Sequence, residues 1–155
     1  MVVKRWEILE NLIVAFGCKS IVEVGVRKGD IAIYLLDSVR GIEKYYIVDI
    51  DFSVLNLVPI QKYGSIVSLH NMSSVLAAKE IPDDLDMVFI DAEHSYEACK
   101  EDIEAWLPKV RNGGIICGHD YCDDCPGIAQ AVHECLGSEI NLEYDGDVNI
   151  WWTRK

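Results

Sequence analysis

A regular alternation of short apolar runs with amphipathic helical runs is the feature that most constrains how this chain folds. Residues 20–25, 44–50 and 85–91 have the length and residue types of strands, and residues 85–91 are apolar on both faces. A strand of that kind is typical of the buried centre of a parallel sheet. Helical runs at residues 30–40 and 95–110 follow two of these strands. The alternation therefore predicts an α/β fold, with a mostly parallel sheet covered by helices on both faces.

Further runs extend this pattern to both ends of the chain. Apolar residues at helical spacing predict a helix over residues 5–17, and Pro59 predicts an irregular helix after the second strand. The pair Gly113-Gly114 is expected to turn the chain into the fifth strand. The last two strands are expected to form a β-hairpin through residues 145–147. The remaining predicted elements are strands 66–69, 115–118, 140–144 and 148–153, and helices 73–80 and 126–137.

The size of the chain suits one compact unit. Its 155 residues are 50% hydrophobic, which predicts a single domain over residues 1–155, of which residues 1–17 hold a short N-terminal helix. No apolar run approaches the roughly 18–20 residues that a membrane span needs, so no membrane partner is expected. The N-terminal residues lack the charged and then apolar pattern of a signal peptide. We therefore expect a cytoplasmic protein.

Charge is spread unevenly along the chain. The net charge is −12, and residues 1–77 hold 8 basic and 8 acidic side chains, so all of this charge falls in residues 78–155. Phosphate backbones repel so acidic a protein, and nucleic acid is therefore not an expected partner. The acidic half favours either a bound cation or a solvated acidic face.

Six cysteines raise the question of metal or disulfide chemistry. Without an export signal, free thiols are expected, and Cys18, Cys99 and Cys117 have the apolar neighbours of core residues. The other three cysteines suggest an alternative function. A structural zinc ion accepts the spacing of His119, Cys122 and Cys125, with His133 or Cys135 as a further ligand. The chain would then be a zinc-stabilised, non-catalytic binding module.

Ligands of open α/β sheets bind beyond the carboxyl ends of the strands, so the residues at those ends matter most. Gly25 and Gly29 follow the first strand and permit a tight turn with close approach to a ligand. Asp49 ends the second strand and is placed to accept hydrogen bonds from a ribose. This pairing indicates a nucleoside cofactor. A nicotinamide-dependent oxidoreductase shares these features, although the chain lacks the G-x-G-x-x-G pattern of that class.

The fourth and fifth strands end in groups suited to acid–base or metal chemistry. Asp91 follows the fourth strand, and His119 and Asp120 end the fifth. Neighbouring parallel strands bring these three side chains to one edge of the sheet, where they can hold a divalent metal such as Mg²⁺. His94 lies three residues after Asp91, and an imidazole suits a general base at neutral pH. The sequence therefore predicts a metal site with a base beside it.

Taken in order, these motifs resemble those of one known family. The chain resembles the class I S-adenosylmethionine-dependent methyltransferases, and among them the small-molecule O-methyltransferases related to macrocin O-methyltransferase, with catechol O-methyltransferase more distant. The resemblance spans residues 18–155 and rests on V-E-V-G-V-R-K-G (22–29), V-D-I-D (48–51), F-I-D-A-E-H-S-Y-E-A-C-K-E-D-I (89–103), N-G-G-I-I-C-G-H-D-Y (112–121) and P-G-I-A-Q-A-V (126–132). It implies a Rossmann-like methyltransferase fold with seven strands and an enzyme that methylates a hydroxyl of a small molecule.

The resemblance also implies a role for each site residue. The cofactor S-adenosylmethionine would be held by Glu23, Gly25 and Gly29 at its amino-acid end and by Asp49 at the ribose. Around the adenine it would be bordered by Ile50, Met72, Ser73 and Ser74, and Asp91 would also contact the cofactor. Asp91, His119 and Asp120 fall at the metal-ligand positions, and His94 falls at the position of the catalytic base. His119 stands where relatives often carry a carboxylate, which keeps a ligand but removes a charge. The N-terminal cap is also short, which predicts either a homo-oligomer that completes the pocket or a large, exposed substrate.

Overall fold

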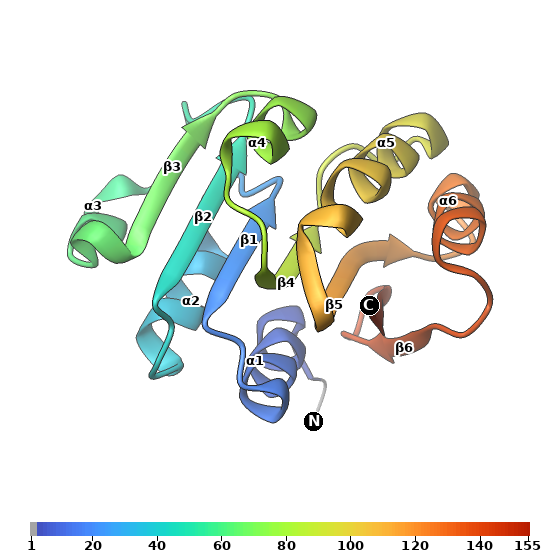
Figure 1. Cartoon of the computed structure of the whole chain (residues 1–155), viewed down its shortest axis with the longest axis horizontal. Coiled ribbons are helices and arrows are strands. Elements are labelled where there is room, and N and C mark those ends of the chain that lie inside the picture. Colours follow the sequence, from blue (N-terminus) through green and yellow to red (C-terminus); the bar gives the residue numbers. More distant parts are fainter. Residues whose placement is uncertain (1–2) are drawn as a thin grey trace.

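Seven strands form a single sheet in the order β3-β2-β1-β4-β5-β7-β6 (Figure 1). The computed structural model describes residues 3–155, so Met1 and Val2 of the predicted domain lie outside the described residues. Strands β1 to β5 run parallel, and β7 pairs antiparallel with both β5 and β6. The predicted α/β fold, a mostly parallel seven-stranded sheet with a C-terminal antiparallel hairpin, is thereby confirmed.

Most predicted elements are present, with ends shifted by a few residues. The strands are β1 (Ser20–Val24), β2 (Lys44–Asp49), β3 (Val67–Asn71), β4 (Leu85–Ile90), β5 (Val110–Tyr121), β6 (Asn141–Tyr144) and β7 (Asn149–Arg154). The α-helices are α1 (Arg5–Phe16), α2 (Asp30–Ser38), α3 (Leu57–Gln61), α4 (Ser74–Glu80), α5 (Tyr96–Trp106) and α6 (Pro126–Leu136). Two short 3₁₀ turns, η1 (Gly64–Ile66) and η2 (Leu107–Lys109), complete the order.

Strand β5 is longer than predicted, because Gly113 and Gly114 lie inside it and not before it. The register of its pairing with β4 shifts between Leu85 and Met87. Gly113 has a φ of +76°, a conformation that glycine adopts without strain. The glycine pair therefore forms an irregularity within the strand, and regular pairing continues on either side of it.

Proline accounts for the early end of one predicted helix and lies within another. The helix predicted over residues 95–110 ends as α5 at Trp106, and η2 follows, because Pro108 has no N–H to continue the helical hydrogen bonds. Helix α3 holds Pro59 as its third residue, within the first turn, where the missing N–H has no helical partner. At its start, α5 is capped by the Ser95 hydroxyl, which accepts the N–H of Ala98 at 3.3 Å.

The helices cover the two faces of the sheet in two groups of three (Figure 1). Helices α1, α2 and α3 pack on one face, and α4, α5 and α6 pack on the other. Because alternate strand residues point to opposite faces, Ile21 joins the first core and Val22 the second. Among residues 3–155, no helix has the length and apolarity needed to cross a bilayer.

Candidate active site

A cavity of about 980 Å³ lies at the carboxyl ends of the parallel strands. Its volume is near the upper end of the range for small-molecule sites, roughly 300–1,000 Å³. The ends of β1, β2, β4 and β5 all contribute to it, as expected for an open α/β sheet. Of the predicted site residues, those that line the cavity are Glu23, Gly25, Asp49, Ile50, Met72, Ser73, Ser74, Asp91, His94, His119 and Asp120.

The loop between β1 and α2 is shaped by Gly25 and Gly29. Gly25 has a φ of +83°, and a Cβ there would lie 2.1 Å from the carbonyl oxygen of Asp91. Only glycine allows the loop to approach the end of β4 this closely. Gly29 has a φ of +84°, and a Cβ there would lie 2.9 Å from Cδ1 of Leu55. Gly29 lies just before α2, outside the cavity wall, so what it contributes here is the shape of the loop.

Asp49, at the end of β2, holds the same loop in place. Its Oδ2 accepts the N–H groups of Val26 at 2.8 Å and Arg27 at 2.9 Å. Its Oδ1 accepts the N–H of Asp51 at 3.0 Å. A carboxylate can accept about four hydrogen bonds, so Asp49 retains capacity for a ribose hydroxyl. Its role as a ribose ligand stays a prediction, and the structure adds the role of fixing the glycine loop.

Glu23 is buried in the floor of the cavity. It is 1% exposed, and its Oε2 accepts the hydroxyl proton of Tyr45 at 2.6 Å. Burial raises the pKa of Glu23 to about 8, against the opposing effect of the Tyr45 hydrogen bond. Nearby Asp91 and Asp49 raise this pKa further. Glu23 is therefore protonated at neutral pH when no cation lies beside it, and a cationic group in the cavity would favour its ionised form.

The wall beyond β2 and β3 is built from Ile50, Met72, Ser73 and Ser74, which were predicted to border the adenine. The hydroxyl of Ser74 accepts the indole N–H of Trp106 at 2.8 Å, which fixes its position.

Asp102 of α5 lines the same wall. Burial raises the pKa of Asp102 to about 6, although Ser74 opposes this effect. The sequence offers no signal for this residue, because it lies in the middle of an amphipathic helix among other charged residues.

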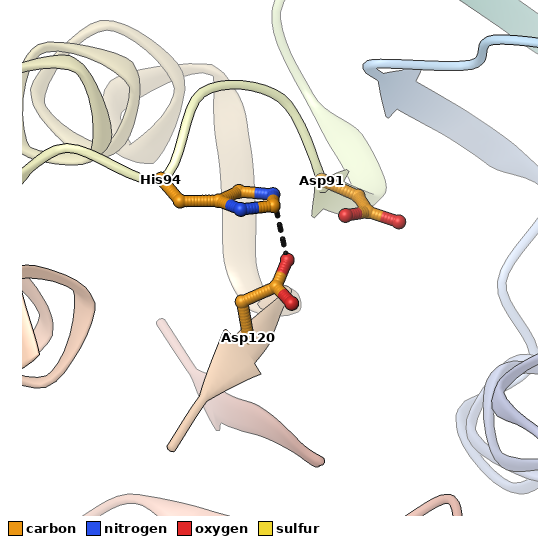
Figure 2. Close-up of side chains that lie close together, drawn as sticks. All are labelled: Asp91, His94 and Asp120. Carbon is orange, nitrogen blue, oxygen red and sulfur yellow. Dashed lines mark ion pairs between the residues drawn. The ribbon is translucent and has the colours of Figure 1, made fainter. Parts of the chain in front are cut away.

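At the other end of the cavity, Asp91, His94 and Asp120 lie close together, with His94 and Asp120 directed at each other (Figure 2). The dashed contact in Figure 2 joins Nε2 of His94 to Oδ2 of Asp120, which lie 2.8 Å apart. One ligand atom from each of the three lies within 4.8 Å of the others. Asp120 adopts a φ of +57°, uncommon for a non-glycine residue, where the register of the β5–β7 pairing shifts between Gly118 and Tyr121. This local backbone turn sets the direction of the Asp120 carboxylate.

His119 lies behind these side chains and is 4% exposed. Its Nδ1 lies 3.2 Å from Oδ2 of Asp120 and 3.6 Å from Oδ1 of Asp91, and its Nε2 lies 3.0 Å from Oδ2 of Asp145. Burial lowers the pKa of His119, but the hydrogen bonds to Asp120 and Asp145 and the charge of Asp91 outweigh burial, so the pKa is raised. Burial raises the pKa of Asp91 to about 6, although the charge of His119 opposes that effect.

The chemistry of this donor set fits a divalent cation. Two carboxylates and an imidazole meet at one point, which is a ligand set that divalent metals accept. His119 has the partner that metal-bound histidines usually have, because Asp145 accepts from its second ring nitrogen. With Nε2 bonded in that way, Nδ1 is the atom directed at Asp91 and Asp120. The predicted ligands Asp91, His119 and Asp120 are thus brought together, and the choice of third ligand lies between His119 and His94.

Two residues at this end were missed by sequence reasoning. Arg5 of α1 contacts Asp91 and Asp145, and both Arg5 and Trp6 line the cavity. Asp145 lies in the β6–β7 turn, where the sequence indicated only hairpin geometry. Nothing in the sequence links residue 5 to residue 91 or 145, because these contacts depend on how α1 packs across the sheet. A charged residue at the start of a helix is otherwise common on solvated surfaces.

The zinc-binding alternative finds no support in the geometry. Within residues 3–155, no cysteine belongs to a group of histidine, cysteine and acidic side chains close enough to hold a metal ion. Cys122 and Cys125 follow β5 as free thiols, and both ring nitrogens of His119 face aspartates.

Comparison with known proteins identifies the family. Residues 22–121 match the profile of a family described as a methyltransferase domain. No curated protein matches the sequence. A structure of an O-methyltransferase from Bacillus cereus in complex with SAH aligns over 97% of this chain and 80% of its own, with a TM-score of 0.76 and 15% identity.

Other solved structures share the fold with different described activities. A rRNA methylase from Streptococcus thermophilus aligns over 100% of this chain and 98% of its own, with a TM-score of 0.76 and 12% identity. A precorrin 8W decarboxylase from Methanobacterium thermoautotrophicum aligns over 95% and 89%, with a TM-score of 0.70 and 18% identity. Identities this low show the fold alone, and the fold does not decide the substrate. The profile match, which spans most of the chain, decides against the nicotinamide-dependent alternative: the chain belongs to the methyltransferase domain family and is an S-adenosylmethionine-dependent methyltransferase.

Proposed function

We propose that this methyltransferase transfers the methyl group of S-adenosylmethionine to a hydroxyl oxygen of a small molecule, with the help of a divalent cation. The observation that carries the proposal is the His94–Asp120 contact beside Asp91, at the end of the cavity away from the predicted adenine wall. Among methyltransferases, the ordered motifs most resemble those of the O-methyltransferases related to macrocin O-methyltransferase. Support for a small acceptor comes from the net charge of −12, which disfavours nucleic acid.

In this proposal the chain's own residues bind and orient the cofactor. The glycine loop, which Gly25 allows to lie against the end of β4, would offer its backbone to the methionine portion. Asp49 accepts from the ribose hydroxyls while it holds the loop. Glu23 lies beneath the loop, where ionisation of its carboxyl offsets the positive charge of the cofactor. The methyl of a sulfonium is already electrophilic, so alignment of the acceptor oxygen is the main task left to the protein.

At the acceptor end, His94 is proposed as the general base. Its Nε2 bonds to Asp120, which orients the ring and leaves Nδ1 to accept the proton of the hydroxyl. Asp91, His119 and Asp120 would hold the cation, since Asp145 orients His119 toward the two carboxylates. A bound divalent cation lowers the pKa of a coordinated hydroxyl and fixes its position. Assigning His119 as third ligand leaves His94 free for proton transfer.

A methyl-transfer assay tests this function. The purified chain is incubated with S-adenosylmethionine, Mg²⁺ and a panel of phenols, catechols and sugar alcohols, and S-adenosylhomocysteine formation is measured. We expect turnover with one or more hydroxyl compounds. EDTA should lower this turnover, and added Mg²⁺ should restore it. A matched panel of amines and thiols serves as the control. Turnover with amines alone would contradict O-methylation. Full turnover in EDTA would contradict the assistance of a cation.

The oligomeric state is a further part of the proposal. Arg5 and Trp6 are the residues of α1 that line the cavity. We propose that a second copy of the chain or the acceptor itself packs against this wall. Light scattering with and without S-adenosylhomocysteine distinguishes the two, because only the first predicts a dimer.

A further inference from the structure

Arg5 places a permanent positive charge inside the acidic end of the cavity. Its Nη1 donates a hydrogen bond to Oδ2 of Asp91 at 3.1 Å, and its Nε lies 3.5 Å from Oδ2 of Asp145. The side chains of Asp91 and Asp145 are 15% and 3% exposed, so both carboxylates are largely shielded from solvent, whereas the Arg5 side chain is 31% exposed. A guanidinium cannot lose its proton at physiological pH, so this charge is always present.

The contacts of Arg5 fall on the aspartates that matter for a cation. Oδ2 of Asp91 bonds to Arg5, and Oδ1 faces Nδ1 of His119 at 3.6 Å. Oδ2 of Asp145 is shared between Arg5 and Nε2 of His119. Arg5 therefore touches one proposed cation ligand directly and, through Asp145, the residue that orients a second.

We infer that Arg5 is a tethered counter-cation that competes with a divalent metal for Asp91 and so sets the metal affinity of the site. The inference rests on the cation site put forward under the proposed function. Like charges a few ångströms apart inside a shielded cavity repel strongly, so an ion bound at Asp91 and the guanidinium destabilise each other. Arg5 also draws electron density from Oδ2 of Asp91, which weakens that carboxylate as a metal ligand.

The same contacts keep the site folded when no ion is bound. Without Arg5, Asp91 and Asp120 would face each other with only the histidines to offset them, and uncompensated buried charge is costly. Arg5 thus has opposite effects on two measurable quantities. It stabilises the metal-free protein, and it lowers the affinity for a divalent ion.

The test is a calorimetric titration of the full chain with Mn²⁺, comparing the natural sequence with the variant Arg5→Met. Methionine keeps the length and apolar contacts of the side chain but removes the charge. Arg27→Met is the matched control, because Arg27 lines the same cavity and carries the same charge, yet it lies in the loop after Gly25. We expect Arg5→Met to bind Mn²⁺ roughly tenfold more tightly than the natural chain, and the affinity of Arg27→Met to change far less. Unchanged or weaker binding in Arg5→Met overturns the inference.

A charge-retaining variant separates charge from folding effects. Arg5→Lys is expected to keep an affinity within about threefold of the natural chain, and a gain equal to that of Arg5→Met would overturn the role of charge. Thermal unfolding gives the second readout: Arg5→Met is expected to melt lower than the natural chain without metal and to gain more from saturating Mn²⁺. If neither protein binds Mn²⁺ while S-adenosylhomocysteine still binds, this inference fails, and methyl transfer without a cation remains.

Discussion

Nε2 of His94 and Oδ2 of Asp120 lie 2.8 Å apart, although His94 follows β4 and Asp120 ends β5. The parallel pairing of β4 with β5 places the ends of the two strands side by side. The left-handed backbone at Asp120 then directs its carboxylate toward the imidazole. Two side chains that are 26 positions apart in the sequence therefore form one unit at the acceptor end of the cavity.

Replacement of His94 tests this unit. In His94→Ala, turnover is expected to fall by roughly 10²–10⁴-fold, because the group proposed to take the hydroxyl proton is lost. Binding of S-adenosylhomocysteine, measured by calorimetry, is expected to stay unchanged. His133→Ala is the control, since His133 lies on α6 and bonds to Tyr121. Intact turnover in His94→Ala would remove its role as the base.

Asp49 is expected to govern cofactor affinity. Asp49→Ala removes the acceptor of the Val26 and Arg27 N–H groups and the proposed ribose contact, so S-adenosylhomocysteine should bind at least about tenfold more weakly. Asp51→Ala is the matched control, because Asp51 is a neighbouring acid whose carboxylate accepts the N–H of Ser53 and which lies outside the cavity wall. Equal affinity in the two variants would argue against Asp49 as a cofactor ligand.

A pair of glycine substitutions separates steric crowding from backbone strain. Gly25 and Gly17 both have positive φ, but a Cβ at Gly25 would clash with Asp91 whereas a Cβ at Gly17 meets nothing within 4 Å. Gly17→Ala should therefore cost only the strain, about 1–2 kcal/mol of unfolding free energy. Gly25→Ala should cost clearly more and displace the cofactor loop. Urea denaturation measures both, and a similar loss in both variants would contradict the close packing at Gly25.

The pKa of Glu23 predicts how stability changes with pH in the cofactor-free protein. Burial raises it from an ordinary value of 4.5 to about 8 in the folded state. Between these values the folded state holds a proton that the unfolded state has lost. The free energy of unfolding should therefore fall as pH rises from about 4.5 to 8, by up to about 1.4 kcal/mol per pH unit from this group.

Glu23→Gln isolates that contribution, because glutamine can still accept from the Tyr45 hydroxyl but does not titrate. The variant is expected to be more stable than the natural chain at pH 8 and similar to it at pH 4.5. Urea denaturation at several pH values gives the comparison. Parallel stability curves for the two proteins would show that Glu23 does not titrate in this range.

The sequence predicted the fold well because the spacing of apolar residues and the positions of proline and glycine at the ends of elements are local features. Alternating apolar runs identified the strands, and Pro126 and Gly137 bounded α6. The errors fell where tertiary pairing overrode local signals. Gly113 lies inside β5, since β5 pairs with β4 before it, at Val110, and again from Ile115 onward.

The sequence could predict those residues of the candidate site that lie at the ends of strands. Asp91 and His119 followed directly from the parallel order of β4 and β5. Arg5, Asp102 and Asp145 could not be predicted in this way. Arg5 and Asp102 reach the cavity from helices, and Asp145 reaches Arg5 and His119 from a turn. The positions of these elements depend on long-range packing, and no residue type or spacing near the three residues marks a site.

The central claim is that one cavity holds the cofactor at the glycine loop and the acceptor beside Asp91, His94 and Asp120. A crystal structure with bound S-adenosylhomocysteine and Mn²⁺, located by anomalous scattering, tests it most directly. The account predicts the ribose within hydrogen-bond distance of Asp49, the sulfur facing His94, and Mn²⁺ bound to Asp91 and Asp120. Cofactor bound outside this cavity, or with its sulfur directed away from His94, would contradict it.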